Sequence, residues 1–399
     1  MEKRKNWDLA ALALIPMIMT LGNSMLIPVL PNIENQLGIT SFQSSMIITI
    51  YSVASIFFIP IAGFLSDRYG RKKVMIPSLI VTGAGGIVSG LSALLFHSPY
   101  YMILLGRLIQ GIGSSGAFPV VIPTVGDMFK KDSDVSKSLG LIETANTFGK
   151  VLSPVLGSLL ALWVWFVPFL AIPVFSAVAI VLIAILVNVP EKKGESSINF
   201  KSFCFQVRDI LRKKGRWLYA IFMLGWAAMF VYFGFLFFFT NTLEDRYNIR
   251  GIKRGLIIAI PLVVLCITSL AVGKLIGKNK KFMKWLIFAG NLTTAGAVFS
   301  IGFSGSLTML VIILSIAGSG IGASLPSLDA LITEGVNRQN RGTITCLYSS
   351  MRMLGVAVGP PAAAVLLKSS VKTTFFILAA VNVIAALVTL FFVKPSEQT

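Results

Sequence analysis

Long apolar stretches alternate with short polar ones along the whole chain. Twelve of these stretches are long enough for an α-helix to cross about 30 Å of hydrocarbon. We place them at 8–31, 43–65, 74–96, 99–128, 136–161, 164–189, 217–240, 255–276, 284–303, 307–334, 342–367 and 373–394. The pattern predicts an all-α integral membrane protein with twelve transmembrane helices.

The longest polar interruption, residues 190–216, separates six apolar stretches from six. Residues 1–189 are therefore predicted to form an N-terminal six-helix bundle, and residues 217–399 a C-terminal one. The segment between them is predicted to be a cytoplasmic linker. Within it, apolar and basic residues alternate at helical spacing over 198–211. This part is either a helix on the inner membrane surface or a plain tether.

The distribution of basic residues predicts how the helices are oriented in the membrane. The chain is 55% hydrophobic and has a formal net charge of +19. Of its 35 Lys and Arg residues, 26 fall on the side of the N-terminus, 6 on the opposite side and 3 inside predicted helices. The positive-inside rule places both termini in the cytoplasm of a plasma-membrane protein. The basic residues are spread over many loops instead of one face, so they do not indicate nucleic-acid binding.

No pattern typical of an enzyme or a metal site is present. The three cysteines, Cys204, Cys266 and Cys346, are far apart and form no Cys-x-x-Cys pair. The chain has no Gly-x-x-x-x-Gly-Lys-Ser/Thr phosphate loop and no Ser/His/Asp cluster. We therefore expect no enzyme activity, no metal and no cofactor, and no direct use of ATP.

Charged residues inside predicted membrane helices are costly and indicate function by default. Arg107, Lys150 and Arg352 are the three cations of this kind. Glu143 precedes Lys150 by seven residues and therefore shares its helix face. Glu143 is predicted to be either a proton carrier or the structural counter-ion of Lys150. Asp329 has the same two alternatives, with Arg352 as its partner.

A small-molecule cavity is predicted to be lined by polar and aromatic residues. Asn146 lies on the same helix face as Glu143 and Lys150. The stretch 217–240 is rich in aromatic residues, and four of them recur at helical spacing. The predicted cavity residues are Asn146, Phe222, Trp226, Phe230 and Phe233. The alternative for each aromatic residue is contact with lipid or with a neighbouring helix.

The loop 63–73 joins two apolar stretches and reads Gly-Phe-Leu-Ser-Asp-Arg-Tyr-Gly-Arg-Lys-Lys. Its ordered glycines, acid and basic run resemble the signature loop between helices 2 and 3 of the major facilitator superfamily. That resemblance implies two pseudo-symmetric six-helix bundles and transport by alternating access. Weak repeats support the two bundles, since Gly111–Pro119 and Gly318–Pro326 are each followed eight residues later by an acid, Asp127 and Glu334.

The resemblance also implies a cytoplasmic gate. Its acid, Asp67, is expected to cap the helix starting near Gly342 and to pair with Arg71. The alternative is an ordinary basic loop on the inner membrane surface. The expected gate residues are Gly63, Asp67, Arg68, Gly70, Arg71, Lys72 and Asp127.

The segment Gly149-x-x-x-Ser153-Pro154-x-x-Gly157-Ser158 resembles the antiporter motif of the twelve-helix drug/proton antiporter branch, with serine in place of glycine at Ser153 and Ser158. Gly355, Gly359 and Pro360 form a similar packing surface in the second half. The resemblance implies a monomeric multidrug efflux protein in membrane lipid. It would export small amphipathic compounds in exchange for protons, with Arg107, Glu143 and Asp329 as coupling candidates. The alternatives are a dedicated exporter of one metabolite, siderophore or lipid or sugar precursor, and a non-transporting membrane sensor.

Overall fold

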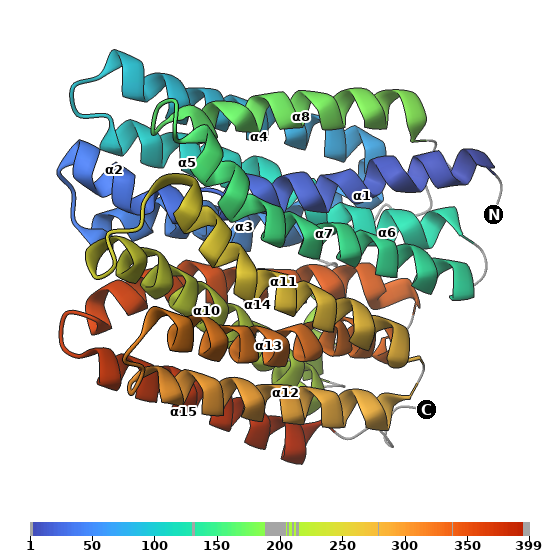
Figure 1. The fold of residues 1–399 in the computed structure, drawn as a ribbon. Coiled ribbons are helices and arrows are strands. Elements are labelled where there is room, and N and C mark those ends of the chain that lie inside the picture. The colour runs from blue at the N-terminus through green and yellow to red at the C-terminus, as the bar shows by residue number, and fades with distance from the viewer. Residues whose placement is uncertain are drawn as a thin grey trace.

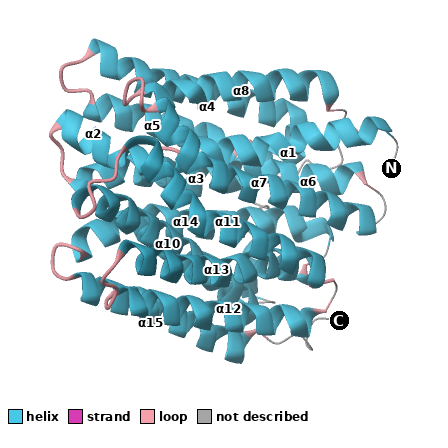
Figure 2. Cartoon of the chain, viewed as in Figure 1, coloured by secondary structure: helices cyan, strands magenta, loops and turns pink. Residues whose placement is uncertain are grey.

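The chain folds as a bundle of long helices that run side by side (Figure 1). The computed structural model describes residues 3–129, 132–187, 205, 207–209, 211–212, 215–277, 279–336 and 338–393. No β-strand occurs within these residues (Figure 2). The first half contains α1 (Lys3–Ser24), η1 (Ile27–Val29), α2 (Leu30–Leu37), α3 (Ser41–Tyr69), α4 (Arg71–Leu95), α5 (Tyr100–Ser115), α6 (Phe118–Met128), α7 (Asp132–Leu160) and α8 (Val167–Leu186). The second half contains α10 (Gly215–Asp245), α11 (Gly251–Leu275), α12 (Lys280–Ile301), α13 (Leu307–Gly335), α14 (Arg338–Leu366) and α15 (Val371–Phe392).

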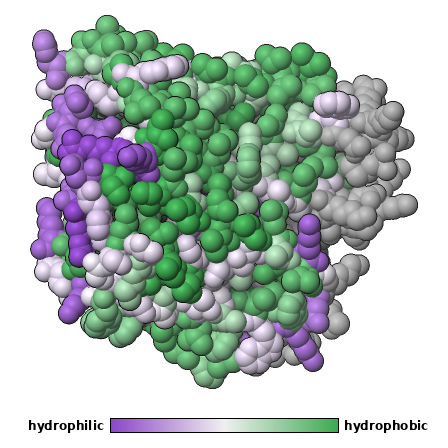
Figure 3. Space-filling model, viewed as in Figure 1, coloured by the Kyte–Doolittle hydropathy of each residue, from purple (hydrophilic) through white to green (hydrophobic). Residues whose placement is uncertain are grey.

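The helices have the length and composition of a membrane protein. Among the described residues, nine helical segments are long and apolar enough to cross a membrane. The helices α7, α12 and α14 are similarly long, at 29, 22 and 29 residues, but are more polar. On the face in Figure 3, hydrophobic side chains cover the middle of the bundle and hydrophilic ones gather toward the helix ends. The predicted all-α membrane fold is confirmed.

Two spans of the first half are broken, whereas their counterparts in the second half are continuous. The first span changes from α1 through η1 to α2 around Pro28 and Pro31, and the fourth changes from α5 to α6 just before Pro119. Proline lacks a backbone N–H and crowds the preceding turn, so it favours such breaks. In α13, by contrast, Pro326 lies inside an unbroken helix. The internal repeat is therefore unequal.

The two halves pack against each other mainly through α3 with α14 and α7 with α11. Small residues permit this close approach. A Cβ added to Gly255 on α11 would collide with the carbonyl oxygen of Pro154 on α7. The Thr49 hydroxyl on α3 also donates a 2.7 Å hydrogen bond to the carbonyl of Ala357 on α14. Most of the 190–216 segment lies outside the described residues, so the domain boundaries and the nature of 198–211 stay predictions.

Candidate functional site

The predicted loop 63–73 is helical except at Gly70, and three helices of the first half meet at this segment, which we still call the 63–73 loop. Asp67 at the end of α3 and Arg71 at the start of α4 form an ion pair of 2.6 Å. The Nε of Arg71 also lies 3.1 Å from a carboxylate oxygen of Asp127 on α6. Arg71 is nine-tenths buried, whereas Asp67 is nearly half exposed. The structure therefore brings Asp67, Arg71 and Asp127 together, as the sequence predicts.

This charge cluster lies against α14 of the second half. A Cβ added to Gly63 would lie 2.9 Å from the sulfur of Cys346, so the glycine permits the close approach of α3 and α14. A small pocket brings Asp67 beside Gly342. However, α14 begins at Arg338, so the prediction that a helix starts near Gly342 is wrong. Gly342 lies past the first helical turn, where backbone N–H groups bond within the helix and need no cap.

The other residues of the loop have separate environments. Gly70 has a φ of 102° and a ψ of 146°, a conformation that favours glycine between α3 and α4. The Lys72 ammonium donates hydrogen bonds to the carbonyls of Ala184 and Val187, at 2.8 Å and 3.1 Å, and so binds the C-terminal end of α8. Arg68 is exposed and lies over the ring of Tyr69 at 5.4 Å. Arg68 and Lys72 therefore lie apart from the Asp67–Arg71–Asp127 cluster.

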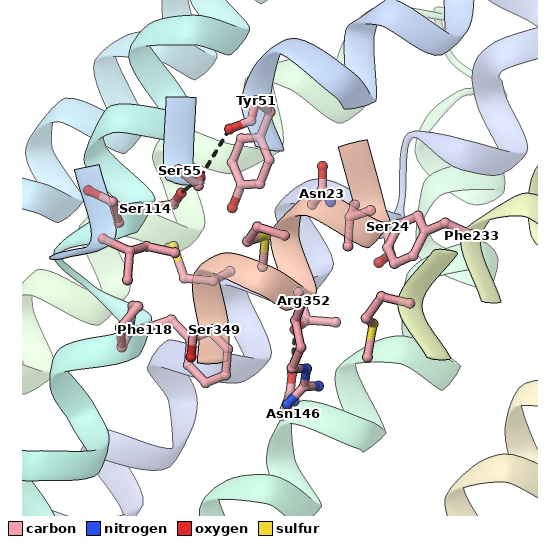
Figure 4. Close-up of a pocket in the computed structure, with 18 of the residues that line it drawn as sticks. Asn23, Ser24, Tyr51, Ser55, Ser114, Phe118, Asn146, Phe233, Ser349 and Arg352 are labelled. Atoms are coloured by element: carbon pink, nitrogen blue, oxygen red, sulfur yellow. Dashed lines mark hydrogen bonds between the residues drawn. The ribbon is translucent and has the colours of Figure 1, made fainter. Parts of the chain in front are cut away.

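A cavity of about 70 Å³ lies in the centre of the bundle, between the two halves. Figure 4 shows its labelled polar residues, contributed by α1, α3, α5, α7 and α14. Small-molecule sites usually occupy about 300–1,000 Å³, so the cavity must widen to hold a ligand. The lining residues are Met19, Thr20, Asn23, Ser24, Tyr51, Ser55, Ile59, Ser114, Ser115, Phe118, Pro119, Asn146, Lys150, Met229, Phe233, Ser349, Arg352, Met353 and Val356.

Two cations line this cavity, one from each half of the chain. Lys150 on α7 is only 6% exposed, and within the described residues its amino group has neither a hydrogen bond nor an ion pair. Arg352 on α14 donates through Nη1 to both carboxylate oxygens of Asp329 on α13, at 3.2 Å and 3.4 Å. Asp329 and Arg352 are therefore partners, as predicted. The cavity combines two positive charges with apolar and hydroxyl groups.

Glu143 bonds to an amide and not to a cation. The Asn146 amide donates to both carboxylate oxygens of Glu143 at 3.2 Å, and accepts a 2.5 Å hydrogen bond from the Thr20 hydroxyl on α1. Glu143 acts on Lys150 only through longer-range electrostatic attraction. No ion pair forms between them in the described part of the chain, and the two predicted roles of Glu143, as proton carrier or as structural counter-ion of Lys150, stay predictions.

Arg107 on α5 is completely buried. Its guanidinium donates hydrogen bonds to Oδ1 of Asn23 on α1 and Oε1 of Gln110, both at 2.6 Å, and to the carbonyl of Ile47 on α3 at 2.9 Å. It also lies over the ring of Tyr51, 4.5 Å from the centroid. Arg107 thus holds three helices together and touches two residues that line the cavity, while a role in proton transfer stays a prediction.

The predicted packing residues lie at helix contacts. Added Cβ atoms on Gly149 and Gly157 of α7 would press against the backbone of Met17 in α1 and of Met25 directly after α1. Ser153, on the same helix, is fully buried and donates to the carbonyl of Lys150 at 3.0 Å. In the second half, Gly355 and Gly359 of α14 approach the backbone of α10, and Pro360 beside them is buried.

Only one of the four predicted aromatic residues lines the cavity. Phe233 does so, and Asn146 is also a lining residue, as predicted. Trp226 and Phe230 stack on each other at 5.2 Å, and their backbone meets Gly355 of α14. Phe222 belongs to an apolar cluster elsewhere in the second half. The predictions for Phe222, Trp226 and Phe230 are wrong because these residues serve contacts between helices.

A second polar cluster joins the halves at the end of the bundle opposite the 63–73 loop. Glu244 on α10 pairs with Arg254 on α11, and both are almost fully buried. Two amides of α2 reach this pair: Asn35 donates to Glu244 at 3.1 Å, and Asn32 accepts from Arg254 at 3.3 Å. The sequence analysis missed this cluster. The available signal was an acid and an arginine ten residues apart at the ends of two adjacent apolar stretches.

The sequence analysis also missed most polar residues of the cavity. Asn23, Tyr51 and Ser55 are examples on α1 and α3, and the Ser55 hydroxyl donates to the backbone carbonyls of Tyr51 and Gly111 at 3.0 Å. Single small polar residues are common in apolar helices, where they bond to the preceding turn. Their type alone therefore does not reveal which of them face a cavity.

Comparison with known proteins agrees with this architecture. The sequence profile of the Major Facilitator Superfamily matches residues 12–360, with a further match at 279–399. The chain is 47% identical over 394 residues to the "Bacillibactin exporter" of Bacillus subtilis (strain 168), covering 98% of each chain. It is 25% identical over 355 residues to the class G tetracycline resistance protein of Vibrio anguillarum, covering 85% of each. The crystal structure of the human organic anion transporter MFSD10 (TETRAN) superimposes with a TM-score of 0.78 at 19% identity, covering 98% of this chain and 100% of that one.

Proposed function

Because the chain belongs to the major facilitator superfamily of membrane transporters, we propose that it is a dedicated exporter of one metabolite, a siderophore of the bacillibactin type. The observation that carries this proposal is the 47% identity to an exporter of that compound over almost the entire length of both proteins. It favours a dedicated exporter, the alternative of the sequence analysis, over the broad drug antiporter.

The chemistry of the central cavity supports an anionic aromatic cargo. Lys150 and Arg352 offer positive charge from both halves, and a buried cation without a close partner favours an anion. Met19, Met229 and Phe233 offer apolar contact, since methionine is flexible and polarizable and adapts to aromatic rings. A cationic drug, by contrast, would meet the ammonium of Lys150, which has no hydrogen-bond or ion-pair partner among the described residues, whereas Arg352 is paired with Asp329.

The two polar clusters at opposite ends of the bundle support alternating access. The Asp67–Arg71–Asp127 cluster lies beside α14, and the Glu244–Arg254 pair binds the amides of α2. Each can hold one end of the cavity closed while the other end opens. In this proposal the protein is a monomer in the cell membrane with both termini in the cytoplasm. The 63–73 loop then closes the cytoplasmic end.

Broad drug efflux is the second candidate. It is favoured by the close contact of Gly149 and Gly157 with α1, at the positions that resemble the antiporter motif, and by relatives that include tetracycline resistance proteins. The same cavity would then have to accept compounds of differing charge. The predicted exchange for inward-moving protons belongs to this second candidate.

Export in cells lacking their own siderophore exporter tests the proposal. Cells expressing this chain should release bacillibactin into the medium, as measured by mass spectrometry, while cells expressing Lys150→Met should retain it. Resistance to several unrelated drugs is measured in the same strains. Drug resistance without bacillibactin release would support the second candidate and refute the first.

A further inference from the structure

Three serine hydroxyls line the central cavity from the first half of the chain. They belong to Ser55 on α3 and to Ser114 and Ser115 on α5, and each residue is at most 5% exposed. The hydroxyl oxygens of Ser55 and Ser114 lie 3.1 Å apart, and Figure 4 shows the two side chains next to each other. The cavity therefore has hydroxyl groups on the wall that α3 and α5 form.

The protons of these hydroxyls have partners in the backbone. Ser114 donates to the carbonyl of Gly111 at 3.0 Å, and Ser115 donates to the carbonyl of Ile112 at 2.6 Å. Ser55 has two such carbonyls at 3.0 Å, one in α3 and one in α5. A serine hydroxyl has one proton to donate and two lone pairs that accept. Because the backbone takes the protons, these oxygens face a cargo as hydrogen-bond acceptors.

The cations of the cavity come from other helices. Lys150 belongs to α7 and Arg352 to α14, and their charged groups donate hydrogen bonds but accept none. A cargo that fills the cavity therefore meets acceptors at α3 and α5, and positively charged donors at α7 and α14.

Arg107 makes the serine side of the cavity unfavourable for a cation. Its buried guanidinium lies 4.5 Å from the ring centroid of Tyr51, which also lines the cavity. Within the described residues, its hydrogen bonds go to side-chain amides and backbone carbonyls, all of them uncharged. Charges repel strongly where the effective dielectric constant is low. An ammonium group is therefore disfavoured beside the serines, whereas an uncharged O–H or N–H group is not.

We propose that the three serines select the cargo by accepting hydrogen bonds from its uncharged O–H or N–H groups, while the two cations hold its acidic group. The cargo then belongs to the class of acids that carry a neutral hydrogen-bond donor on the same molecule. An acid without such a donor leaves the serine oxygens unsatisfied when it displaces water, so it should bind more weakly. This inference rests on the proposed function, because it requires the central cavity to be the cargo site.

Binding of matched aromatic acids to the purified full-length protein tests the inference. Meta-hydroxybenzoate is compared with meta-fluorobenzoate, which has nearly the same size but no O–H group. Meta-acetamidobenzoate is compared with meta-acetoxybenzoate, in which an oxygen replaces the N–H group. One uncharged hydrogen bond changes a binding constant by roughly two- to tenfold. We expect calorimetry to show a preference of about this size for the donor compound in at least one pair, and that pair identifies the donor as O–H or N–H.

Variants connect the preference with the serines. The double variant Ser55→Ala, Ser114→Ala should lose the preference, and the single variant Ser114→Ala should reduce it. Ser52→Ala is the matched control and should keep the preference. Ser52 lies on the same helix α3, is fully buried and donates to the carbonyl of Ile48 at 3.0 Å, but it is not among the lining residues.

The cations should act independently of the serines. Lys150→Met should weaken the binding of both members of each pair and leave the preference unchanged. Equal binding of the two members of both pairs by the wild type would overturn the inference. A full preference in both serine variants would overturn it as well.

Bacillibactin as a further probe separates this inference from the proposed function. If the wild type prefers the donor compounds through the serines and does not bind bacillibactin, the proposed cargo is wrong and the selection of neutral donors stands. If bacillibactin is bound and exported while both members of each pair bind equally, the inference fails alone. Absence of binding by bacillibactin and by all four acids would refute both.

Discussion

The side-chain amide of Asn35 on α2 donates a 3.1 Å hydrogen bond to Glu244 on α10, and so joins the two halves at the end opposite the 63–73 loop. Glu244 is buried against Arg254, whereas Asn35 is exposed. Both residues of the Glu244–Arg254 ion pair belong to the second half of the chain, whereas Asn35 belongs to the first half. Separation of the halves at this end therefore breaks the amide contact and leaves the ion pair intact.

Asn35→Ala should favour the conformation that is open at this end. Hydrogen bonds to charged groups contribute about 1.5–3 kcal/mol, so the loss shifts the conformational equilibrium roughly tenfold or more. Cys346 reports the shift because it is buried beside Gly63 at the other end. In a Cys204→Ser, Cys266→Ser background, maleimide should label Cys346 more slowly in Asn35→Ala. Gln36→Ala, one residue along the same exposed surface, is the matched control. Equal labelling rates in all three proteins would argue against a latch at Asn35.

Asp67→Asn should have the opposite effect on the same reporter. The substitution removes the charge that pairs with Arg71, leaving Asp127 as its other acidic partner. The end beside α14 should then open more readily, so that Cys346 is labelled faster and transport slows severely. Asp67→Glu, which keeps the charge, should restore much of the slow labelling. Unchanged transport in reconstituted vesicles would refute the proposed gate.

The fold and the pairing of Asp67 with Arg71 were predictable because their physical signals lie in the local sequence. Length and apolarity alone mark most membrane helices. The Asp67–Arg71 pair is visible as an acid and a base four residues apart on adjoining helix ends. The residues that line the cavity were harder to predict, because tertiary packing decides which side chains face it. Phe230 and Phe233 look equivalent in sequence, yet Phe230 meets the glycines of α14 and Phe233 lines the cavity.

The cluster of Glu244, Arg254, Asn32 and Asn35 was unpredictable for a different reason. The amides of this cluster come from the first half of the chain and its ion pair comes from the second. Asn35 and Glu244, for example, are 209 residues apart. No local pattern encodes such a contact. The contacts of Glu143 were missed for another reason, because its seven-residue spacing from Lys150 suggested a pair. In the structure, the Asn146 amide three residues along the same helix donates to the Glu143 carboxylate, and Thr20 of α1 donates to Asn146.

Lys150→Met should increase stability and reduce binding of an anionic cargo. A buried ammonium without a close partner costs free energy, so an apolar side chain of similar length should raise the melting temperature. The same change removes one of two cations of the cavity, and we expect affinity for an anion to fall about tenfold or more. Thermal unfolding and ligand binding measure the two effects. Lys274→Met, at an exposed lysine of α11, should change neither. A stable Lys150→Met protein with full affinity would exclude Lys150 from the binding site.

Arg107→Lys should destabilise the first half of the chain. Lysine keeps the charge, but its compact ammonium cannot span the separate positions at which the planar guanidinium reaches Asn23, Gln110 and Ile47. Unsatisfied buried acceptors cost about 1–3 kcal/mol each, so the melting temperature should fall by several degrees. Arg246→Lys, at an exposed arginine, is the control and should unfold like the wild type. A normal melting temperature combined with lost transport would instead indicate that Arg107 acts directly in transport.

Phe233→Leu and Phe230→Leu should separate cargo contact from helix packing. Phe233 lines the cavity, so its replacement should raise the KM for the cargo and leave the melting temperature nearly unchanged. Phe230 is stacked on Trp226 and its backbone meets Gly355 and Gly359, so its replacement should leave a void beside α14. Because a large-to-small change in a packed core costs at least about 1 kcal/mol, Phe230→Leu should lower the melting temperature while the KM stays near that of the wild type. Transport in vesicles and thermal unfolding of both variants decide the matter. The reverse assignment of the two effects would place Phe230 in the cargo site and remove Phe233 from it.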